Sequence, residues 1–207
     1  MNKLLYILLF CWCGFLSVSA QTTLEVEVQN GSKITINGDA SIVKFKIYQN
    51  ADNFLKRNYI IAAYRTQNRI YLDNNEINIP VRSFTSNNRM ALKDFLRMME
   101  PDKYKSLDIQ LNYIELPTDL NSDLAGKAVM DFTIKGITKK YTIPIYSSKE
   151  GNSYVFNSKK QINIKDFGLV APNAMMGLIK VNDVIDVGLH FILKIESLQQ
   201  AQLLKSD

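Results

Sequence analysis

The chain has 207 residues, of which 46% are hydrophobic and 22% charged, with a formal net charge of +5 at neutral pH. That length is typical of one domain, large enough to form a core by burial alone. The basic residues are scattered, in pairs such as Lys139-Lys140 and Lys159-Lys160, and no aromatic stripe alternates with them. Nucleic acid is therefore not expected as a partner.

The first 20 residues have the order of a secretory signal peptide. Lys3 precedes an apolar run of 13 residues from Leu4 to Leu16, and small residues follow, ending at Ala20. A run that short does not span a bilayer, which needs ~20 apolar residues. We therefore expect residues 1–20 to be removed on export, with an uncleaved membrane anchor as the alternative. Both cysteines, Cys11 and Cys13, lie in this leader, so residues 21–207 contain none.

Alternating apolar and polar residues dominate the chain from Leu24 to Ile195, a pattern that predicts half-buried β-strands. The clearest segments are 43–47, 107–113, 128–134, 141–145, 162–164 and 185–195. Turn signals separate them at Asn30-Gly31, Asn37-Gly38, Asp73-Asn74-Asn75 and Glu150-Gly151-Asn152. About ten strands at this spacing predict an all-β barrel or sandwich.

One segment has helical periodicity instead. Asn88 is a candidate N-cap for a helix over residues 89–99, and Glu100-Pro101 would end it. Leu92, Phe95 and Met99 share one face of this helix. It is either a lid on a barrel end or part of a ligand mouth, and the two roles are compatible. After residue 196 the chain is polar and only weakly helical, so residues 197–207 are expected to be a tail of the 21–196 domain.

Consistently apolar strand faces must be buried, and closure into a barrel also removes exposed strand edges. An antiparallel barrel of eight to ten strands is therefore the favoured fold. Its interior would be a solid core, an apolar ligand cavity or an open lumen. The pairs Met98-Met99 and Met175-Met176 flank predicted strands, and flexible methionines suit surfaces that adapt to variable apolar ligands.

Residue types that carry catalysis or bind metals are scarce. His190 is the single histidine, and no cysteine follows the leader, so an imidazole or thiolate metal site is not expected. There is no Gly-x-Ser-x-Gly turn and no glycine-rich phosphate loop. We expect neither enzymatic activity nor a cofactor.

Several segments resemble the YceI-like family, whose members are exported, lipocalin-like barrels associated with polyisoprenoids and other amphiphilic lipids. The resemblance lies in residues 36–45, 79–84, 88–90, 94–96, 102–104, 126–140, 166–169 and 177–183. It implies a periplasmic or extracellular protein whose partner is an amphiphilic lipid, such as a polyisoprenoid, a quinone or a fatty acid. Peripheral membrane contact is an additional expectation.

The large residues of the inward faces and of the helix are the candidate ligand contacts. They are Phe45, Ile47, Leu92, Phe95, Met99, Leu111, Tyr113, Met130, Phe132, Phe156, Met175 and Phe191. A non-enzymatic interaction module with a solid side-chain core is the alternative function.

Overall fold

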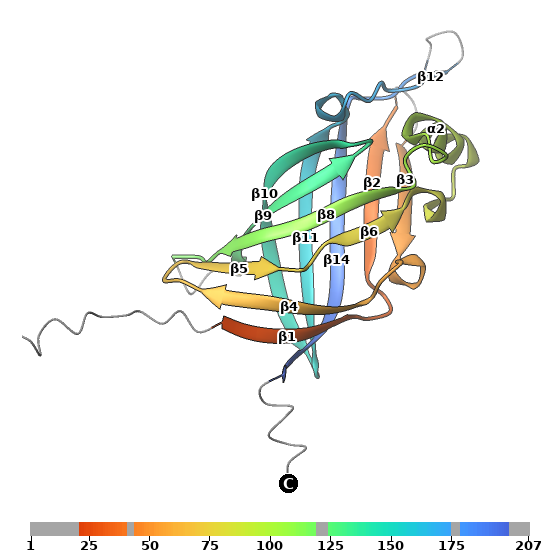
Figure 1. Cartoon of the computed structure of the whole chain (residues 1–207). Helices are drawn as coiled ribbons and strands as arrows, with labels where there is room; N and C mark the ends of the chain where they lie inside the picture. The colour runs from red at the N-terminus through yellow and green to blue at the C-terminus, as the bar shows by residue number, and fades with distance from the viewer. Residues whose placement is uncertain (1–20, 41–43, 119–123, 175–178, 199–207) are drawn as a thin grey trace, which may run out of the picture.

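The computed structural model describes residues 21–40, 44–118, 124–174 and 179–198. These residues form an antiparallel β-barrel with one α-helix, α2 (Arg89–Met99), and three short 3-10 helices, η1 (Ala51–Asn53), η2 (Val81–Ser83) and η3 (Ile164–Phe167) (Figure 1). The all-β prediction and the single helix at 89–99 are confirmed. No helix in the described part of the chain is long and apolar enough to cross a membrane.

The strands are β1 (Gln21–Val28), β2 (Lys33–Asp39), β3 (Lys44–Asn50), β4 (Asn58–Arg65), β5 (Arg69–Asp73), β6 (Ile77–Pro80), β7 (Thr85–Ser86), β8 (Ser106–Glu115), β9 (Leu124–Ile134), β10 (Ile137–Glu150), β11 (Ser153–Asn163), β12 (Asn173–Ala174), β13 (Ile179–Lys180) and β14 (Val184–Ser197).

Eight strands close into a ring in the order β1-β4-β5-β8-β9-β10-β11-β14, and the pairing of β14 with β1 completes it. All neighbours are antiparallel. The predicted tail begins at residue 197, yet Ser197 still pairs with Leu24 in this ring. The structure is therefore a barrel, and not two stacked sheets.

Two long strands of the barrel, β14 and β8, each pair with two shorter strands along one edge. β14 pairs with β2 over its first half and with β1 over its second half. At the bend between β1 and β2, the Ser32 hydroxyl donates to the Ile192 carbonyl at 3.2 Å and accepts from the Ile192 amide at 2.8 Å. The predicted turn at Asn30-Gly31 is thus a bend in one long strand, with Gly31 at φ 89°, and the chain direction is not reversed.

The edge of β8 is shared in the same way by β5 and β6. Asn75 joins the three strands at the bend. Its side-chain amide donates to the carbonyls of Leu72 and Leu111, and its Oδ1 accepts from the Leu111 amide at 2.7 Å. The Asp73-Asn74-Asn75 signal therefore marks a second bend.

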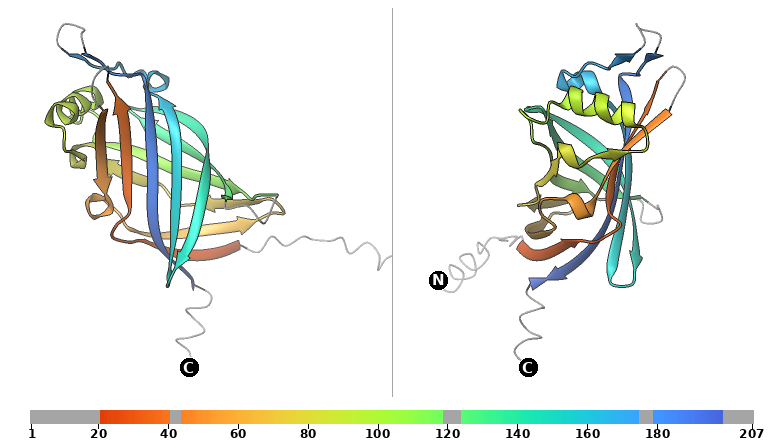
Figure 2. Two further views of the ribbon diagram at one scale, coloured as in Figure 1. Left: turned by 180° about the vertical axis from the view of Figure 1, so that it is seen from behind. Right: turned by 90° about the vertical axis from the view of Figure 1, so that its right-hand side faces the viewer.

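These bends split the sheet at one end of the barrel. At that end β2, β3 and β7 continue the sheet from β14, whereas β6 is the last strand on the side of β8. β6 does not pair with β2, β3 or β7. Helix α2 packs on β7, β3 and η2 across this gap. Figure 2 shows α2 lying across the barrel at the end opposite the start of β1 and the end of β14. We call this the helix end.

Two predicted local features are wrong. Asn37-Gly38 does not form a turn, because both residues lie inside β2, where Gly38 pairs with Phe45. The Phe45 ring occupies the space that a side chain at residue 38 would need. Ile164 leaves the predicted strand and starts η3, since the Asn163 side chain accepts from the Lys165 amide at 3.1 Å and caps that turn.

Candidate ligand-binding cavity

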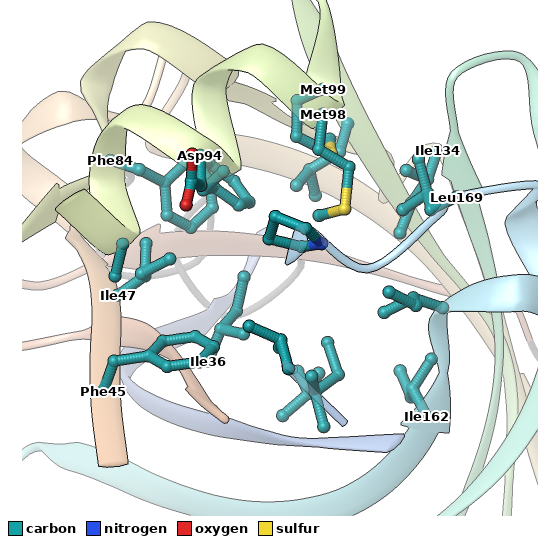
Figure 3. A pocket seen from close by; sticks show the side chains of 18 of the residues that line it. Ile36, Phe45, Ile47, Phe84, Asp94, Met98, Met99, Ile134, Ile162 and Leu169 are labelled. Atoms are coloured by element: carbon teal, nitrogen blue, oxygen red, sulfur yellow. The ribbon is translucent and has the colours of Figure 1, made fainter. Parts of the chain in front are cut away.

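A cavity of about 200 Å³ lies at the helix end of the barrel (Figure 3). Its walls come from β2, β3, β8, β9, β11 and β14, and it is covered by α2 and by the chain around η3. All but two of its 25 lining residues are apolar. They are Ile34, Ile36, Ala40, Phe45, Ile47, Phe84, Asn88, Met90, Ala91, Asp94, Phe95, Met98, Met99, Leu107, Ile109, Phe132, Ile134, Ile162, Ile164, Phe167, Leu169, Pro172, Val181, Ile185 and Val187.

Helix α2 is capped at its N-terminus and is tied to the barrel at its C-terminus and along its buried face. At its N-terminus the Asn88 Oδ1 accepts from the Ala91 amide at 3.0 Å, so the predicted cap is confirmed. At its C-terminus the Lys135 ammonium donates to the Met98 carbonyl at 3.3 Å. Between these points the Phe95 ring packs on Phe84 with centroids 5.1 Å apart. The lid is therefore fixed by side chains, whereas the strands around it are held by backbone ladders.

Asp94 and Asn88 are the two polar residues of the lining. The Asp94 side chain is 18% exposed, and its Oδ1 accepts from Arg97 at 2.8 Å. Its second carboxylate oxygen has no hydrogen-bond donor among the described residues. The apolar interior thus ends at a rim that carries one carboxylate and one amide.

Tyr141 supports the cavity wall from behind. Its ring contacts Phe132 edge-on at 5.7 Å and Phe167 at 6.2 Å, and both of these residues line the cavity. Its hydroxyl donates to Asp166 at 2.9 Å. Burial, and then this hydrogen bond to a carboxylate, raise the pKa of Tyr141 to about 12. Tyr141 therefore keeps its proton well into the alkaline range.

Five of the twelve residues predicted to contact a ligand line the cavity together: Phe45, Ile47, Phe95, Met99 and Phe132. Leu92 is half-buried on α2 and packs against the core outside the lining. Met175 lies outside the described residues.

Four more of the predicted residues lie farther along the barrel, away from the lining. Leu111 is paired with Met130, and Phe156 with Phe191. Phe191 shares a strand face with the lining residues Ile185 and Val187, and its ring packs on Phe54 at 6.3 Å. Beyond the cavity, aromatic side chains thus pack on one another inside the barrel.

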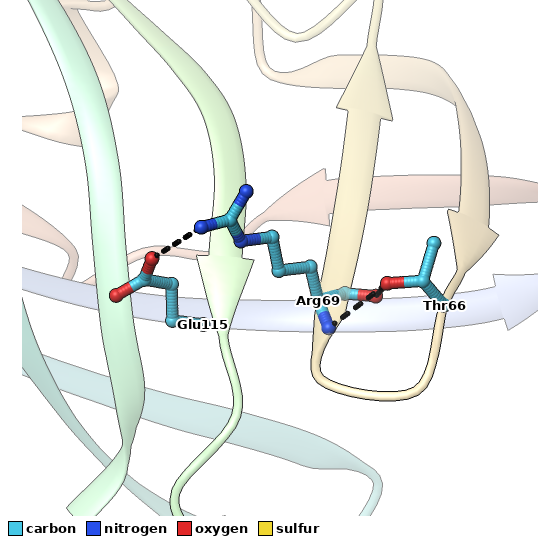
Figure 4. A network of polar contacts seen from close by, with 3 residues as sticks. All are labelled: Thr66, Arg69 and Glu115. Atoms are coloured by element: carbon cyan, nitrogen blue, oxygen red, sulfur yellow. Dashed lines mark hydrogen bonds and ion pairs between the residues drawn. The ribbon is translucent and has the colours of Figure 1, made fainter.

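Tyr113 lies on the outer face of the barrel. The register shifts after Leu111, so that Leu111 pairs with Met130 but Tyr113 pairs with Val129, on the other side of the sheet. There its ring packs against Tyr71 at 5.4 Å and under the Arg69 guanidinium at 4.7 Å. Arg69 also donates to Glu115 at 3.0 Å and thereby joins β5 to β8 (Figure 4). Simple alternation along the sequence does not reveal such a bulge.

Sequence reasoning missed several lining residues. Ile34 and Ile36 alternate as a strand should, but the Asn37-Gly38 dipeptide signals a turn beside them. The alternation predicts Ile162 and Ile164 as apolar strand positions but does not assign them to the ligand. Leu169 and Pro172 belong to a loop, where no periodicity marks them.

Groups that could carry other chemistry are dispersed. The His190 Nδ1 shares a hydrogen bond of 2.7 Å with the Asn157 side chain on β11. In the described segments no three His, Cys, Asp or Glu side chains come close enough to hold a metal ion.

An eight-stranded antiparallel barrel with a helix-covered apolar cavity at one end defines the class of lipocalin-like binding barrels. Within that class, the family model of the YceI-like domain matches residues 16–193. The chain therefore belongs to the YceI-like family.

Solved structures with a similar fold include BcnA of Burkholderia cenocepacia. It has a TM-score of 0.57 and 14% sequence identity, over 78% of this chain and 95% of that one. A YceI protein of Campylobacter jejuni has a TM-score of 0.46 at 13% identity, over 68% of this chain and 81% of that one. No curated protein matches the sequence.

Proposed function

We propose that this protein is an exported, non-catalytic carrier that holds the apolar chain of an amphiphilic lipid in the cavity under α2. The observation that carries the proposal is the lining, in which 23 of 25 residues are apolar. Such a surface gains free energy by burying hydrocarbon and offers almost no partner to a polar ligand. A polyisoprenoid, a quinone and a fatty acid are the candidate ligand classes.

The cavity volume limits how much of such a ligand is enclosed. Taking roughly 30 Å³ for a group the size of a water molecule, a cavity of about 200 Å³ holds about seven methylene-sized groups. At ~0.8 kcal/mol per buried methylene, they contribute about 6 kcal/mol before the costs of association. A longer chain has to continue past the rim or displace α2.

The rim suggests the orientation of the ligand. With the apolar chain inside, the polar end group lies beside Asp94 and Asn88, the two polar residues of the lining. An ionised fatty acid would then place its carboxylate near that of Asp94, which is unfavourable even though the Arg97 guanidinium paired with Asp94 weakens the repulsion. An uncharged end group, such as an alcohol or a quinone ring, avoids this repulsion. We therefore favour an isoprenoid-type ligand over a fatty acid.

Export and the lack of catalysis are parts of the same proposal. The leader over residues 1–20 supports export, although it lies outside the described residues. The mass of the protein recovered from the envelope or medium of expressing cells tests this directly. Loss of the leader supports export, and a cytoplasmic full-length chain contradicts it.

Ligand binding is tested first by native mass spectrometry of the purified protein, followed by solvent extraction and lipid analysis. We expect a bound species whose mass matches an extracted lipid. A fluorescent fatty-alcohol probe then gives affinities for variants. Clean apo protein with no affinity for quinones, prenols or fatty acids would overturn the proposal.

Two matched substitutions identify the cavity as the site. Ile36→Trp places a large ring in the cavity, whereas Ile60→Trp places it on the outer face of β4, where Ile60 is 61% exposed. We expect Ile36→Trp to lose probe binding by tenfold or more, while Ile60→Trp binds as the parent does. Equal binding by both variants would favour the solid-core interaction module instead.

A further inference from the structure

The charges of this protein are distributed unevenly between the helix end of the barrel and the rest of the chain. We define the cavity-end surface as residues 39–40, 44–46, 80–105, 134–141, 163–172 and 179–184, which surround α2 and the adjacent strand ends (Figure 1). These segments carry thirteen Lys or Arg against six Asp or Glu, a net formal charge of +7. The other residues from 21 to 207 carry eleven basic and fourteen acidic side chains, a net charge of −3.

Contacts between these segments show that they form one surface. The Asn182 amide donates to the Asp39 carbonyl at 2.9 Å, and the Ile164 amide donates to the Asp183 carbonyl at 2.8 Å. Lys135, from the β9–β10 turn, reaches the C-terminus of α2. Segments that are far apart in the sequence are thus adjacent around the cavity.

The acidic residues of the cavity-end surface do not offset its positive charge. Four of the six are already in ion pairs with basic residues of the same surface: Asp94 with Arg97, Glu100 with Lys135, Asp102 with Arg82, and Asp183 with Lys165. Arg89 and Lys93 are exposed and form no ion pair with the described acidic residues, and Lys103 is exposed beside Glu100, which already pairs with Lys135. A basic excess therefore faces solvent around the lid.

Exposed apolar side chains lie among these basic residues. Met90 is 63% exposed and also lines the cavity, so the cavity reaches the surface beside it. Val170 is 78% and Val184 47% exposed, and Ile137 is exposed as well. These four residues are half of the eight large hydrophobic residues that are exposed in the described part of the chain.

We propose that the cavity-end surface docks on an anionic lipid bilayer. Basic residues around protruding apolar side chains are the combination that binds the interface of such a membrane. The basic residues come from several elements around a broad rim, which suits a flat charged surface better than a single acidic peptide. Docking would turn the cavity opening beside Met90 toward the bilayer. The inference goes beyond lipid binding in the cavity and does not depend on it.

Vesicle sedimentation tests the docking. The probes are vesicles of phosphatidylglycerol mixed with phosphatidylethanolamine, and neutral vesicles of phosphatidylcholine. We expect the protein to bind the anionic vesicles at low ionic strength, to dissociate as salt is added, and not to bind the neutral ones. Absence of binding to anionic vesicles, or equal binding to both kinds, would overturn the proposal.

Charge reversal locates the surface. Arg89→Glu with Lys93→Glu changes α2, whereas Lys127→Glu with Lys149→Glu makes the same charge change on exposed residues of β9 and β10 away from the helix end. Each basic residue near an anionic surface is worth roughly a fivefold change in partitioning. The α2 variant should therefore bind at least about thirtyfold more weakly, and the control should change by much less. Equal losses would show that net charge alone is responsible and would refute the assigned surface.

A fluorescent reporter distinguishes docking of this surface from general adsorption. Trp12, the single tryptophan of the sequence, lies in the leader, so once residues 1–20 are removed the Met90→Trp variant carries one tryptophan. Its emission should shift to the blue on anionic vesicles, as an indole does on entering the interface. Leu55→Trp, at a residue outside the cavity-end surface, should show no shift. A shift for Leu55→Trp alone would contradict the proposed orientation. The cavity probe assay is independent of these results, so failure of docking and failure of lipid binding are separable.

Discussion

Gly38 and Phe45 form a cross-strand pair at the edge of the cavity, and replacing the glycine tests how tightly the two are packed. The two residues are opposite each other in β2 and β3, and Phe45 lines the cavity. A Cβ at residue 38 would lie 2.2 Å from Cζ of Phe45 and within 2.8 Å of both Cε atoms. Gly38→Ala therefore has to displace the aromatic ring.

The expected loss of stability in Gly38→Ala depends on which atoms the new Cβ displaces. The atoms in conflict belong to a side chain, so the backbone ladder can stay intact while the ring moves away and loses its packing. We expect a loss of ~1–3 kcal/mol in the free energy of unfolding, as for other overpacked sites. Gly188→Ala is the matched control. Gly188 lies in β14, and the nearest atom to a Cβ there is 3.8 Å away, so this variant should be neutral or slightly more stable.

Urea unfolding of the two single variants and of a double-mutant cycle with Phe45→Ala measures the effect. Once the ring has been removed, Gly38→Ala should cost almost nothing, which gives a coupling of roughly 2 kcal/mol between the two residues. Two results would refute the reasoning: a Gly38→Ala variant as stable as Gly188→Ala, or a cost that persists without the Phe45 ring.

Three further expectations concern the lid, the core and the rim. Asn88→Ala removes the cap of α2 and should lower the free energy of unfolding by ~1 kcal/mol; Asn87→Ala, one residue earlier, is the control in the same urea assay. Burial raises the pKa of Tyr59 to about 12 from 10.0. Because the folded state keeps this proton longer than the unfolded state, the associated stability is complete below pH 10 and declines by about 2–3 kcal/mol as the pH rises toward 12. Tyr59→Phe should flatten that decline in unfolding curves measured across this range, and an unchanged slope would disprove the assignment. Asp94→Asn should strengthen binding of a fatty acid at least about fivefold and leave a fatty alcohol of equal chain length nearly unchanged, since like charges ~4 Å apart repel by ~1 kcal/mol even in water; a parallel change for both ligands would contradict the placement of the end group at the rim.

The local elements of this fold could be read from the sequence because short-range chemistry determines them. Asn88 caps α2 as predicted, and Gly136, at φ 78°, makes the tight β9–β10 turn. The alternating segments are strands because a half-buried sheet demands alternation. These signals require only neighbouring residues.

The position of the cavity within the barrel depends on pairings that no local pattern encodes. The residues around Asn30-Gly31 carry no local signal that β1 and β2 share the edge of β14. They also carry none that Ser32 bonds to Ile192, which is 160 residues away in the sequence. The pattern therefore predicts inward faces correctly except after the bulge at Leu111, which turns Tyr113 outward, and it does not say which inward residues meet a cavity. Phe132 lines it, whereas Phe156, also predicted, lies beyond it.

The split sheet explains why the cavity lies at the helix end. Adjacent strands in a sheet are only ≈ 4.8 Å apart, and a ring of eight strands is just wide enough to be filled by its inward side chains or to hold one small ligand. An α-helix with its side chains is about 10 Å wide, roughly twice the strand spacing. At the helix end β6 does not pair with β3 or β7, and α2 packs on β7, β3 and η2. Side-chain contacts of α2 therefore stand where a backbone ladder would otherwise continue the sheet. In the proposed carrier, α2 is the element that a long lipid chain would displace on entry.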